Sequence, residues 1–236
     1  MARAVADCGL DAVFSYAGRT ETPVAQPLPT RIGGFGGVAG LQAFLADQEI
    51  THVIDATHPF AAQMSRNAVA ACAGQVPLVA LQRPAWVAGD GDRWIHVPDM
   101  AHAVQALPDV PARVFLAIGK QTLNDFAAKP QHHYLLRLVD PPGDVLPLAK
   151  ATAIIARGPF SAAGDTALLQ THAITHIVAK NAGGAGAEAK LLAARALRLP
   201  VILIDRPAVP ERQVVTTVAG VMDWLHHTTA FAERGV

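Results

Sequence analysis

The second half of this chain repeats the plan of its first half. Ile50–Ala56, with the sequence ITHVIDA, returns as Ile174–Lys180, with the sequence ITHIVAK. An alanine-rich segment of helical character follows each copy, and a short apolar strand then leads into Arg-Pro-Ala at Arg83–Ala85 and at Arg206–Ala208. Because these landmarks share one order and nearly one offset, we predict two lobes built on the same scaffold. A chance likeness between two α/β segments is the alternative.

Both lobes are predicted to be α/β structures with parallel sheets. Short apolar strands alternate with amphipathic helices, which is typical of βαβ units. Strands such as Val201–Ile204 are continuous runs of Val, Ile and Leu, as expected where helices cover both faces of a sheet. The stretch Pro108–Pro111 separates the copies. We therefore expect lobes at residues 1–110 and 111–236, with the functional site between them.

The repeat predicts that the first copy is incomplete. The second copy opens with a strand at Arg113–Ile118, a turn at Gly119 and then a helix. The first copy opens inside the corresponding helix, at Met1–Asp7, and continues to a strand at Asp11–Tyr16. We therefore expect the first lobe to lack an N-terminal strand and its loop. An in-frame stop codon just upstream of the first codon would contradict this expectation.

The composition excludes several classes of partner. Lys and Arg together number 19, as do Asp and Glu, so no overall field draws this chain to nucleic acid or an anionic membrane. No apolar run reaches the length of a membrane span and no secretory signal is visible, which favours the cytoplasm. Cys8 and Cys72 indicate neither a disulfide framework nor a metal site. The sequence leaves the oligomeric state open.

A glycine-rich loop is the clearest ligand-binding signal in the first lobe. Arg31–Gly37, with the sequence RIGGFGG, directly precedes a predicted helix. Glycines let a ligand approach the backbone closely, and a helix N-terminus with free N–H groups attracts an anion. A purely structural hinge is the alternative. The residues that we expect to contact a cofactor here are Gly33, Gly34, Phe35, Gly36 and Gly37.

Two further strand ends in the first lobe carry candidate residues. Arg19 and Thr20 follow the predicted strand Asp11–Tyr16, which takes the place of the second strand in a dinucleotide-binding domain. An arginine there suits the 2′-phosphate of NADP, and a solvated turn is the alternative. Asp55, Ala56 and Thr57 stand at the carboxyl end of a later strand and complete the expected cofactor-binding set.

His58 is the candidate for chemistry in the first lobe. It follows Thr57 at the carboxyl end of a strand, where open α/β sheets bind their ligands. An imidazole titrates near neutrality, so His58 is expected to position a substrate or to donate a proton. A histidine that is merely satisfied by the turn backbone is the alternative.

Basic residues occupy the corresponding strand ends of the second lobe. Lys120, Arg137, Arg157 and Lys180 stand at or near successive strand ends, and Gly158 replaces the glycine loop. Cations at neighbouring strand ends favour a polyanionic ligand that is held by charge-assisted hydrogen bonds. Scattered surface charge is the alternative.

The sequence is similar to the precorrin-6A reductase family of cobalamin biosynthesis. The resemblance covers essentially the whole chain and depends on short motifs in a specific order: Tyr16–Thr20, Arg31–Gly37, Asp55–Ala61, Gln82–Trp86, Gly158–Phe160, Lys180–Gly184, Lys190–Arg195 and Asp205–Pro207. It implies two Rossmann-like lobes, with NADPH bound mainly by the first. It also implies reduction of one double bond in precorrin-6A, a polycarboxylate corrin precursor, by hydride delivery at C19 to give precorrin-6B. The family's N-terminal strand and Gly-Gly-Thr-type loop have no counterpart here.

Together, the motifs and the resemblance predict a cytoplasmic oxidoreductase acting on a CH–CH bond. NADPH is assigned to the first-lobe residues and the tetrapyrrole-derived carboxylates to the basic residues and Gly158 of the second. His58, Lys180 or solvent is expected to supply the proton. A non-catalytic nucleotide- or polyanion-binding module is one alternative, and a reductase of the cobalt-containing form or of another polycarboxylate is the other.

Overall fold

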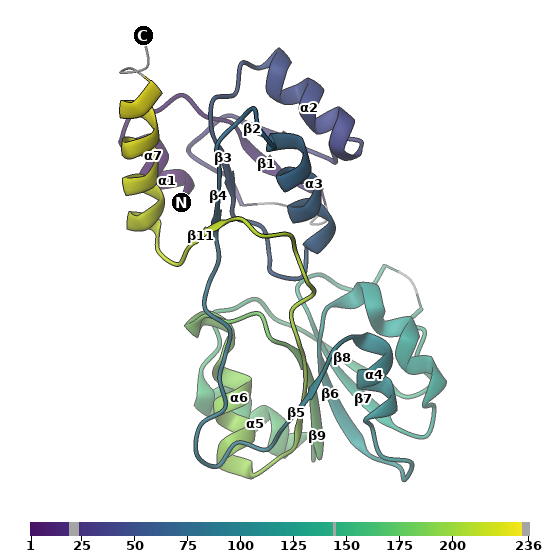
Figure 1. Cartoon of the computed structure of the whole chain (residues 1–236). Helices are drawn as coiled ribbons and strands as arrows, with labels where there is room; N and C mark the ends of the chain where they lie inside the picture. Colours follow the sequence, from purple (N-terminus) through teal and green to yellow (C-terminus); the bar gives the residue numbers. More distant parts are fainter. Residues whose placement is uncertain (19–23, 144, 233–236) are drawn as a thin grey trace. The chain divides into compact units, whose positions relative to one another are not determined.

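The computed structural model describes residues 1–18, 24–143 and 145–232, in which strands alternate with helices along the chain (Figure 1). All strand pairs among these residues are parallel. The expected α/β fold with parallel sheets is therefore confirmed. Within this described part of the chain, no helix combines the length and the apolar character that crossing a membrane requires.

The chain forms two compact units, and it passes from one to the other twice. The first unit consists of Met1–Arg83 and Ala208–Val236, and the second of Pro84–Pro207. This division differs from the expected boundary near residue 110. The last strand of each sequence copy pairs with a sheet of the unit that the other copy mainly forms. Strand β5 (Trp94–Val97) joins the sheet of the second unit, and β11 (Gln213–Val215) joins a sheet of the first.

The second unit contains a six-stranded sheet in the order β5-β10-β9-β6-β7-β8. Counted from β6 along the chain, with β5 last, this order is 3-2-1-4-5-6, the Rossmann arrangement. The apolar residues in the middle of its central strands are buried, as the continuous Val, Ile and Leu runs predict. The remaining strand bounds are β6 Arg113–Ala117, β7 His133–Leu138, β8 Ala151–Ile155, β9 His176–Lys180 and β10 Val201–Ile204.

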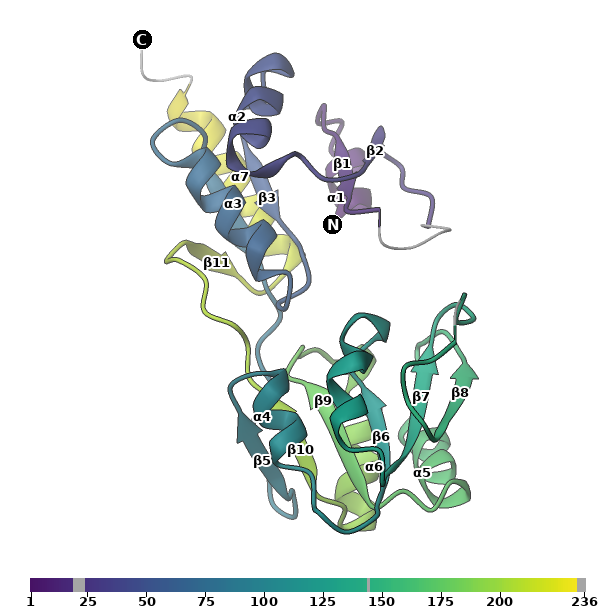
Figure 2. The same ribbon diagram turned by 90° about the vertical axis from the view of Figure 1, so that its right-hand side faces the viewer.

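Helices cover both faces of this sheet, with α5 beside α6 on one face and α4 on the other (Figures 1 and 2). Ser161 caps α5, because its hydroxyl accepts a hydrogen bond from the backbone N–H of Gly164. The expected helix after Gly119 is a 3₁₀-helix. The bounds are α4 Met100–Gln105, η1 Lys120–Ala128, α5 Ala162–Thr171, η2 Ala185–Ala187 and α6 Ala189–Leu197.

The first unit contains two smaller parallel sheets, one with the order β1-β2 and one with the order β11-β4-β3. Helix α2 packs beside α3, and α1 beside α7. The bounds are α1 Ala2–Asp7, β1 Phe14–Tyr16, β2 Thr30–Ile32, α2 Gly37–Asp47, β3 Val53–Asp55, α3 Ala62–Cys72, β4 Leu78–Leu81 and α7 Val218–Ala232.

Strand β1 is shorter than the sequence predicts. The expected strand begins at Asp11, but pairing begins only at Phe14, which lies opposite Thr30 of β2. Because β2 has three residues, it pairs with only three residues of β1, and Leu10–Val13 pair with no other described strand. The apolar pattern alone therefore predicts a longer strand than the pairing with β2 supports.

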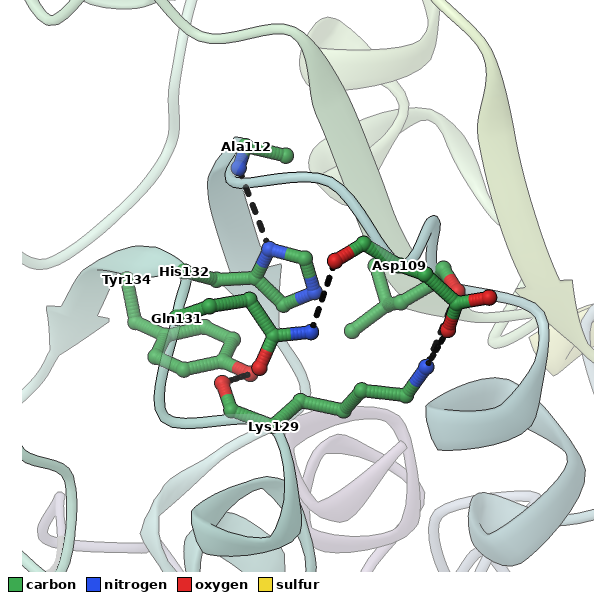
Figure 3. A network of polar contacts seen from close by, with 7 residues as sticks. Asp109, Ala112, Lys129, Gln131, His132 and Tyr134 are labelled. Carbon is green, nitrogen blue, oxygen red and sulfur yellow. Dashed lines mark hydrogen bonds and ion pairs between the residues drawn. The ribbon is translucent and has the colours of Figure 1, made fainter.

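A buried histidine holds the start of β6 in the second unit (Figure 3). His132 is fully buried, and its Nδ1 accepts a hydrogen bond of 3.1 Å from the backbone N–H of Ala112. Nδ1 can accept only in the neutral ring with the proton on Nε2. Burial lowers the pKa of His132, and the nearby charges of Lys129 and His176 lower it further, while Pro108 and Asp109 oppose the shift.

This arrangement predicts that acid destabilises the second unit. The pKa of His132 is lower in the folded state than its ordinary value of 6.5 in the unfolded chain, so the unfolded chain binds more protons below that pH. Folding stability should then fall as the pH falls below that value, by up to about 1.4 kcal/mol per pH unit for one such histidine. Urea unfolding at several pH values measures the slope. His132→Asn retains an acceptor but does not titrate, so its slope should be shallower; an equal slope would contradict the assignment.

Candidate functional site

The glycine loop of the first unit exposes its backbone. Gly36 caps α2 with φ of 80°, and Gly37 follows with φ of 86°. A Cβ atom added at Gly33, Gly34, Gly36 or Gly37 would meet no atom of the protein within 4 Å. The loop thus combines left-handed backbone, which favours glycine, with open space beside it. These are the properties that an anion-binding loop before a helix requires.

Arg31 fixes this loop from within. Its guanidinium donates to the Gly33 carbonyl at 2.9 Å and to the Gly34 carbonyl at 3.0 Å, and it lies 3.9 Å from the centre of the Phe35 ring. On the other side of the loop, a Cβ on Gly40 would lie only 1.7 Å from the Phe35 carbonyl oxygen, so α2 packs tightly against it. These contacts favour a preformed binding loop over a free hinge.

Asp55 organises the turn after β3. Its buried carboxylate accepts from Thr57 through the backbone N–H at 3.1 Å and the hydroxyl at 2.7 Å, and from the Ser65 hydroxyl at 2.6 Å. Both oxygens of Asp55 therefore have partners within the protein. The geometry gives Asp55 a positioning role, in which it orients Thr57 at the strand end.

His58 lies in the same turn and is exposed. Its Nδ1 accepts from the backbone N–H of Phe60 at 3.2 Å. This bond matches the structural alternative for one ring nitrogen, and it assigns the proton of the neutral ring to Nε2. Arg19 and Thr20 lie outside the described residues.

Sequence reasoning missed Arg212, which enters the first unit beside β11. Its nearly buried guanidinium donates to Gln82 Oε1 at 3.1 Å and lies 3.7 Å from Asp55 Oδ2. Arg212 thereby supports the Asp55 carboxylate from a distant part of the chain. No local motif marks this residue, since its partners are distant in sequence.

Arg137 in the second unit, which we expect to contact a substrate, is paired with an acid of the protein itself. Its guanidinium meets both carboxylate oxygens of Asp165, at 2.5 Å and 3.1 Å, and the two side chains are 11% and 4% exposed. The same guanidinium lies 3.7 Å from the centre of the Phe160 ring. Arg137 therefore neutralises a buried acid and supports the Gly158–Phe160 loop.

The other predicted basic residues keep positions at the strand ends. Arg157 is half-exposed, and its Nη2 lies 3.8 Å from Asp140 Oδ1, with Gly158 exposed next to it. Lys120 is exposed directly after Gly119, at the end of β6. Lys180 is the last residue of β9. Since the sheet is parallel, these three residues belong to its carboxyl edge.

The loop that follows Lys180 is clamped by side chains from two other motifs. The Asn181 amide accepts from the Trp86 backbone N–H at 2.8 Å and donates to the Trp86 carbonyl at 3.1 Å. Arg206 donates to the carbonyls of Asn181 and Ala182 at 2.9 Å and 3.2 Å. Three motifs that are far apart in sequence therefore form one rigid network.

Lys190 is a buried ammonium beside this network, and sequence reasoning gave it no role of its own. Its Nζ donates to the Ala187 carbonyl and lies 4.8 Å from the centre of the Trp86 ring. Burial lowers the pKa of Lys190 to about 8, Arg137 adds to this lowering, and Asp165 opposes it. The second unit thus holds a buried amine whose protonation changes close to neutral pH.

These features define a Rossmann-like α/β protein with an open glycine loop before a helix in one unit and basic residues at strand ends in the other. The chain belongs to the precorrin-6x reductase (CbiJ/CobK) family, whose model matches residues 1–226. Membership implies a nicotinamide cofactor, and the open glycine loop at the N-terminus of α2 fits such a group. Among the described residues, no cluster of His, Cys, Asp and Glu side chains is arranged to hold a metal ion.

Comparison with individual relatives agrees with the family. A precorrin-6A reductase from Rhodobacter capsulatus is 70% identical over 226 residues, which cover 95% of this chain and 90% of the relative. Another from Sinorhizobium sp is 49% identical over 205 residues, covering 86% and 78%. A solved structure described as CobK precorrin-6A reductase superposes with a TM-score of 0.92 at 70% identity and covers 96% of this chain and 90% of that one.

Proposed function

We propose that this chain catalyses the NADPH-dependent reduction of one double bond in precorrin-6A to give precorrin-6B. The observation that carries the proposal is the 70% identity to a precorrin-6A reductase over 95% of the chain. A relative described as a cobalt-precorrin-6A reductase, from Priestia megaterium, is only 29% identical over 200 residues. This difference favours the metal-free macrocycle as the substrate.

The first unit supplies the cofactor-binding residues in this proposal. The backbone N–H groups of Gly33–Gly37 and the N-terminus of α2 bind the diphosphate, and Thr57, held by Asp55, offers its hydroxyl. Arg19 and Thr20 recognise the 2′-phosphate, which makes the cofactor NADPH rather than NADH. When bound, the nicotinamide supplies the hydride.

The second unit supplies the residues for the polycarboxylate. Lys120, Arg157 and Lys180 bind its acetate and propionate arms, and the backbone of Gly158 lets one arm approach closely. Arg137 contributes indirectly, by holding Phe160 and with it the loop that carries Arg157. Catalysis then depends on accurate positioning of the two reactants and on exclusion of water.

A turnover assay tests the whole proposal. Incubation with precorrin-6A and NADPH should oxidise the nicotinamide and convert one equivalent of macrocycle for each equivalent of cofactor. NADH should be used less efficiently, with kcat/KM lower by roughly tenfold or more, because Arg19 loses its charged partner. NADPH binding without turnover would support the non-catalytic alternative. Equal use of NADH would remove the assigned role of Arg19.

The source of the proton is tested by two alanine variants, His58→Ala and Lys180→Ala. General acid catalysis typically contributes about 10²–10⁴-fold, so the variant that removes the donor should lower kcat by about that factor. Its Kd for NADPH should change far less. If kcat is unchanged in both variants, solvent supplies the proton, and neither residue takes part in the chemistry.

A further inference from the structure

Lys190 is a buried ammonium with no carboxylate close to it in the described part of the chain. It is 7% exposed and lies in the first turn of α6, where a cation also meets the positive end of the helix dipole. No carboxylate oxygen of the described residues lies within 4.0 Å of its Nζ, and its hydrogen-bond partner is the carbonyl of Ala187. Burying an ammonium without a counter-charge costs free energy. The charge therefore points to a role in function rather than in stability.

The contacts of Lys190 hold both ends of the connection between β9 and α6, residues 181–188. Its Nζ donates to the carbonyl of Ala187, which ends η2, and lies 4.8 Å from the centre of the Trp86 ring. Trp86 in turn donates its backbone N–H to the side-chain oxygen of Asn181 at 2.8 Å. The ammonium thereby joins the start of the connection, through Trp86, to its end at Ala187.

Two further charges of the second unit act on the same amine. Helices α5 and α6 lie side by side (Figure 1). Beyond the effect of burial, Arg137 of β7 lowers the pKa of Lys190 and Asp165 of α5 raises it, so the three charges interact. Arg137 also lies 3.7 Å from the centre of the Phe160 ring, in the loop that carries Arg157. One group of charges thus contacts both loops that we assign to the polycarboxylate.

We propose that Lys190 is a positioning residue, whose ammonium holds the connection between β9 and α6, and with it Lys180, in the arrangement that binds the polycarboxylate. The part of this proposal that concerns the substrate rests on the proposed function. The cation–π contact with Trp86 exists only while the amine carries its proton. Since the pKa of Lys190 is about 8, a moderately alkaline solution removes that contact, while Arg137 keeps its charge. The connection should therefore loosen as the pH rises through this value.

Hydrogen exchange tests the positioning role without any cofactor or substrate. The variant Lys190→Met removes the charge and keeps an unbranched side chain. The amides of Trp86, Ala182 and Glu188 are hydrogen-bonded at the ends of the connection. Their protection factors should fall by about tenfold, the combined contribution of a cation–π contact and a hydrogen bond. Amides of β10 are the internal reference and should not change. Lys150→Met removes an exposed charge of the same unit and should leave all of these amides unchanged.

The pH dependence separates the role of the charge from that of the side-chain volume. In the unaltered chain, the same protection factors, corrected for the intrinsic pH dependence of exchange, should fall between about pH 6.5 and about pH 9.5, because the amine loses its proton in this range. In Lys190→Met they should be low at both values. The measurement on the unaltered chain decides the question even if the variant does not fold. Protection that is independent of pH in the unaltered chain would overturn the proposal, as would equal protection in the variant and the unaltered chain.

Turnover tests the link between Lys190 and the substrate. The KM for precorrin-6A should rise at least about tenfold in Lys190→Met, whereas kcat should change less, because the ammonium positions a binding loop. A looser connection with an unchanged KM would overturn this link. Absence of turnover in the unaltered chain would overturn the proposed function and the substrate part of the proposal together, whereas the exchange measurements decide the positioning role by themselves.

Discussion

Replacing Asp165 by asparagine should lower the free energy of unfolding by about 3–5 kcal/mol, because it leaves the Arg137 guanidinium buried without a counter-charge. The side chains of Arg137 and Asp165 are 11% and 4% exposed, so water cannot replace the lost carboxylate. Asparagine has nearly the same shape, and packing is therefore not the cause. Urea unfolding followed by circular dichroism measures the change.

Removing both charges provides the control for this prediction. The double variant Arg137→Met with Asp165→Leu replaces the pair by apolar side chains of similar size, and should recover most of the lost stability. The two residues contact each other, so their effects should be strongly non-additive. A change below about 1 kcal/mol in Asp165→Asn would mean that the pair is solvated and worth no more than a surface ion pair.

The Arg137–Asp165 pair also illustrates what the sequence could not tell. A basic residue in a strand of a lobe that is expected to bind an anion resembles a ligand contact, and nothing in the sequence distinguishes Asp165 as its partner. Asp165 lies in the first turn of α5, where acids are common on exposed surfaces. Only the packing of α5 against the sheet brings this carboxylate to Arg137. Burial and long-range ion pairing depend on the tertiary structure, and the local sequence does not indicate them.

The predicted boundary near residue 110 differs from the division into two compact units for a related reason. Local patterns gave the parallel α/β fold and located most strands, because apolar runs and turn residues are local signals. They did not reveal that β5 and β11 pair in the other unit's sheet. A short apolar strand has the same pattern whichever sheet it joins. Strand pairing therefore had to come from the structure.

The loops of the candidate site can be located from the sequence more readily than the residues that hold those loops in place. The sequence indicates where the glycine loop, the turn at Asp55 and the loop after Lys180 lie, since glycines and polar residues at strand ends are visible in it; their roles in binding stay predictions. The residues that hold these loops were not found in that role: Arg31, Arg212, Asn181 and Lys190. Asn181 and Arg212 act on residues that only folding brings near, so their spacing in the chain has no fixed meaning. Arg31 and Lys190 donate to carbonyls within three residues, but their residue types alone do not mark that role.

Gly183 permits the strongest test of the loop that follows Lys180. Its φ is +70°, and a Cβ there would lie 2.0 Å from the Pro84 carbonyl oxygen and 2.6 Å from the Arg206 guanidinium. Gly183→Ala must therefore displace Pro84 and Arg206 or change the path of the loop. The left-handed backbone alone costs about 1–3 kcal/mol for a residue other than glycine. We expect a lower free energy of unfolding and, if Lys180 binds substrate as proposed, at least a tenfold rise in KM for precorrin-6A.

Gly186 supplies the matched control, because it lies in the same connection between β9 and α6. A Cβ at Gly186 would meet nothing within 4 Å, and its φ is not in the left-handed region. Gly186→Ala should therefore change neither stability nor KM appreciably. Should Gly183→Ala be as stable and as active as Gly186→Ala, the close contact with Pro84 does not restrict the loop. A loss of stability in Gly183→Ala with an unchanged KM would separate the clamp from substrate binding, and would leave Lys180 without its assigned role.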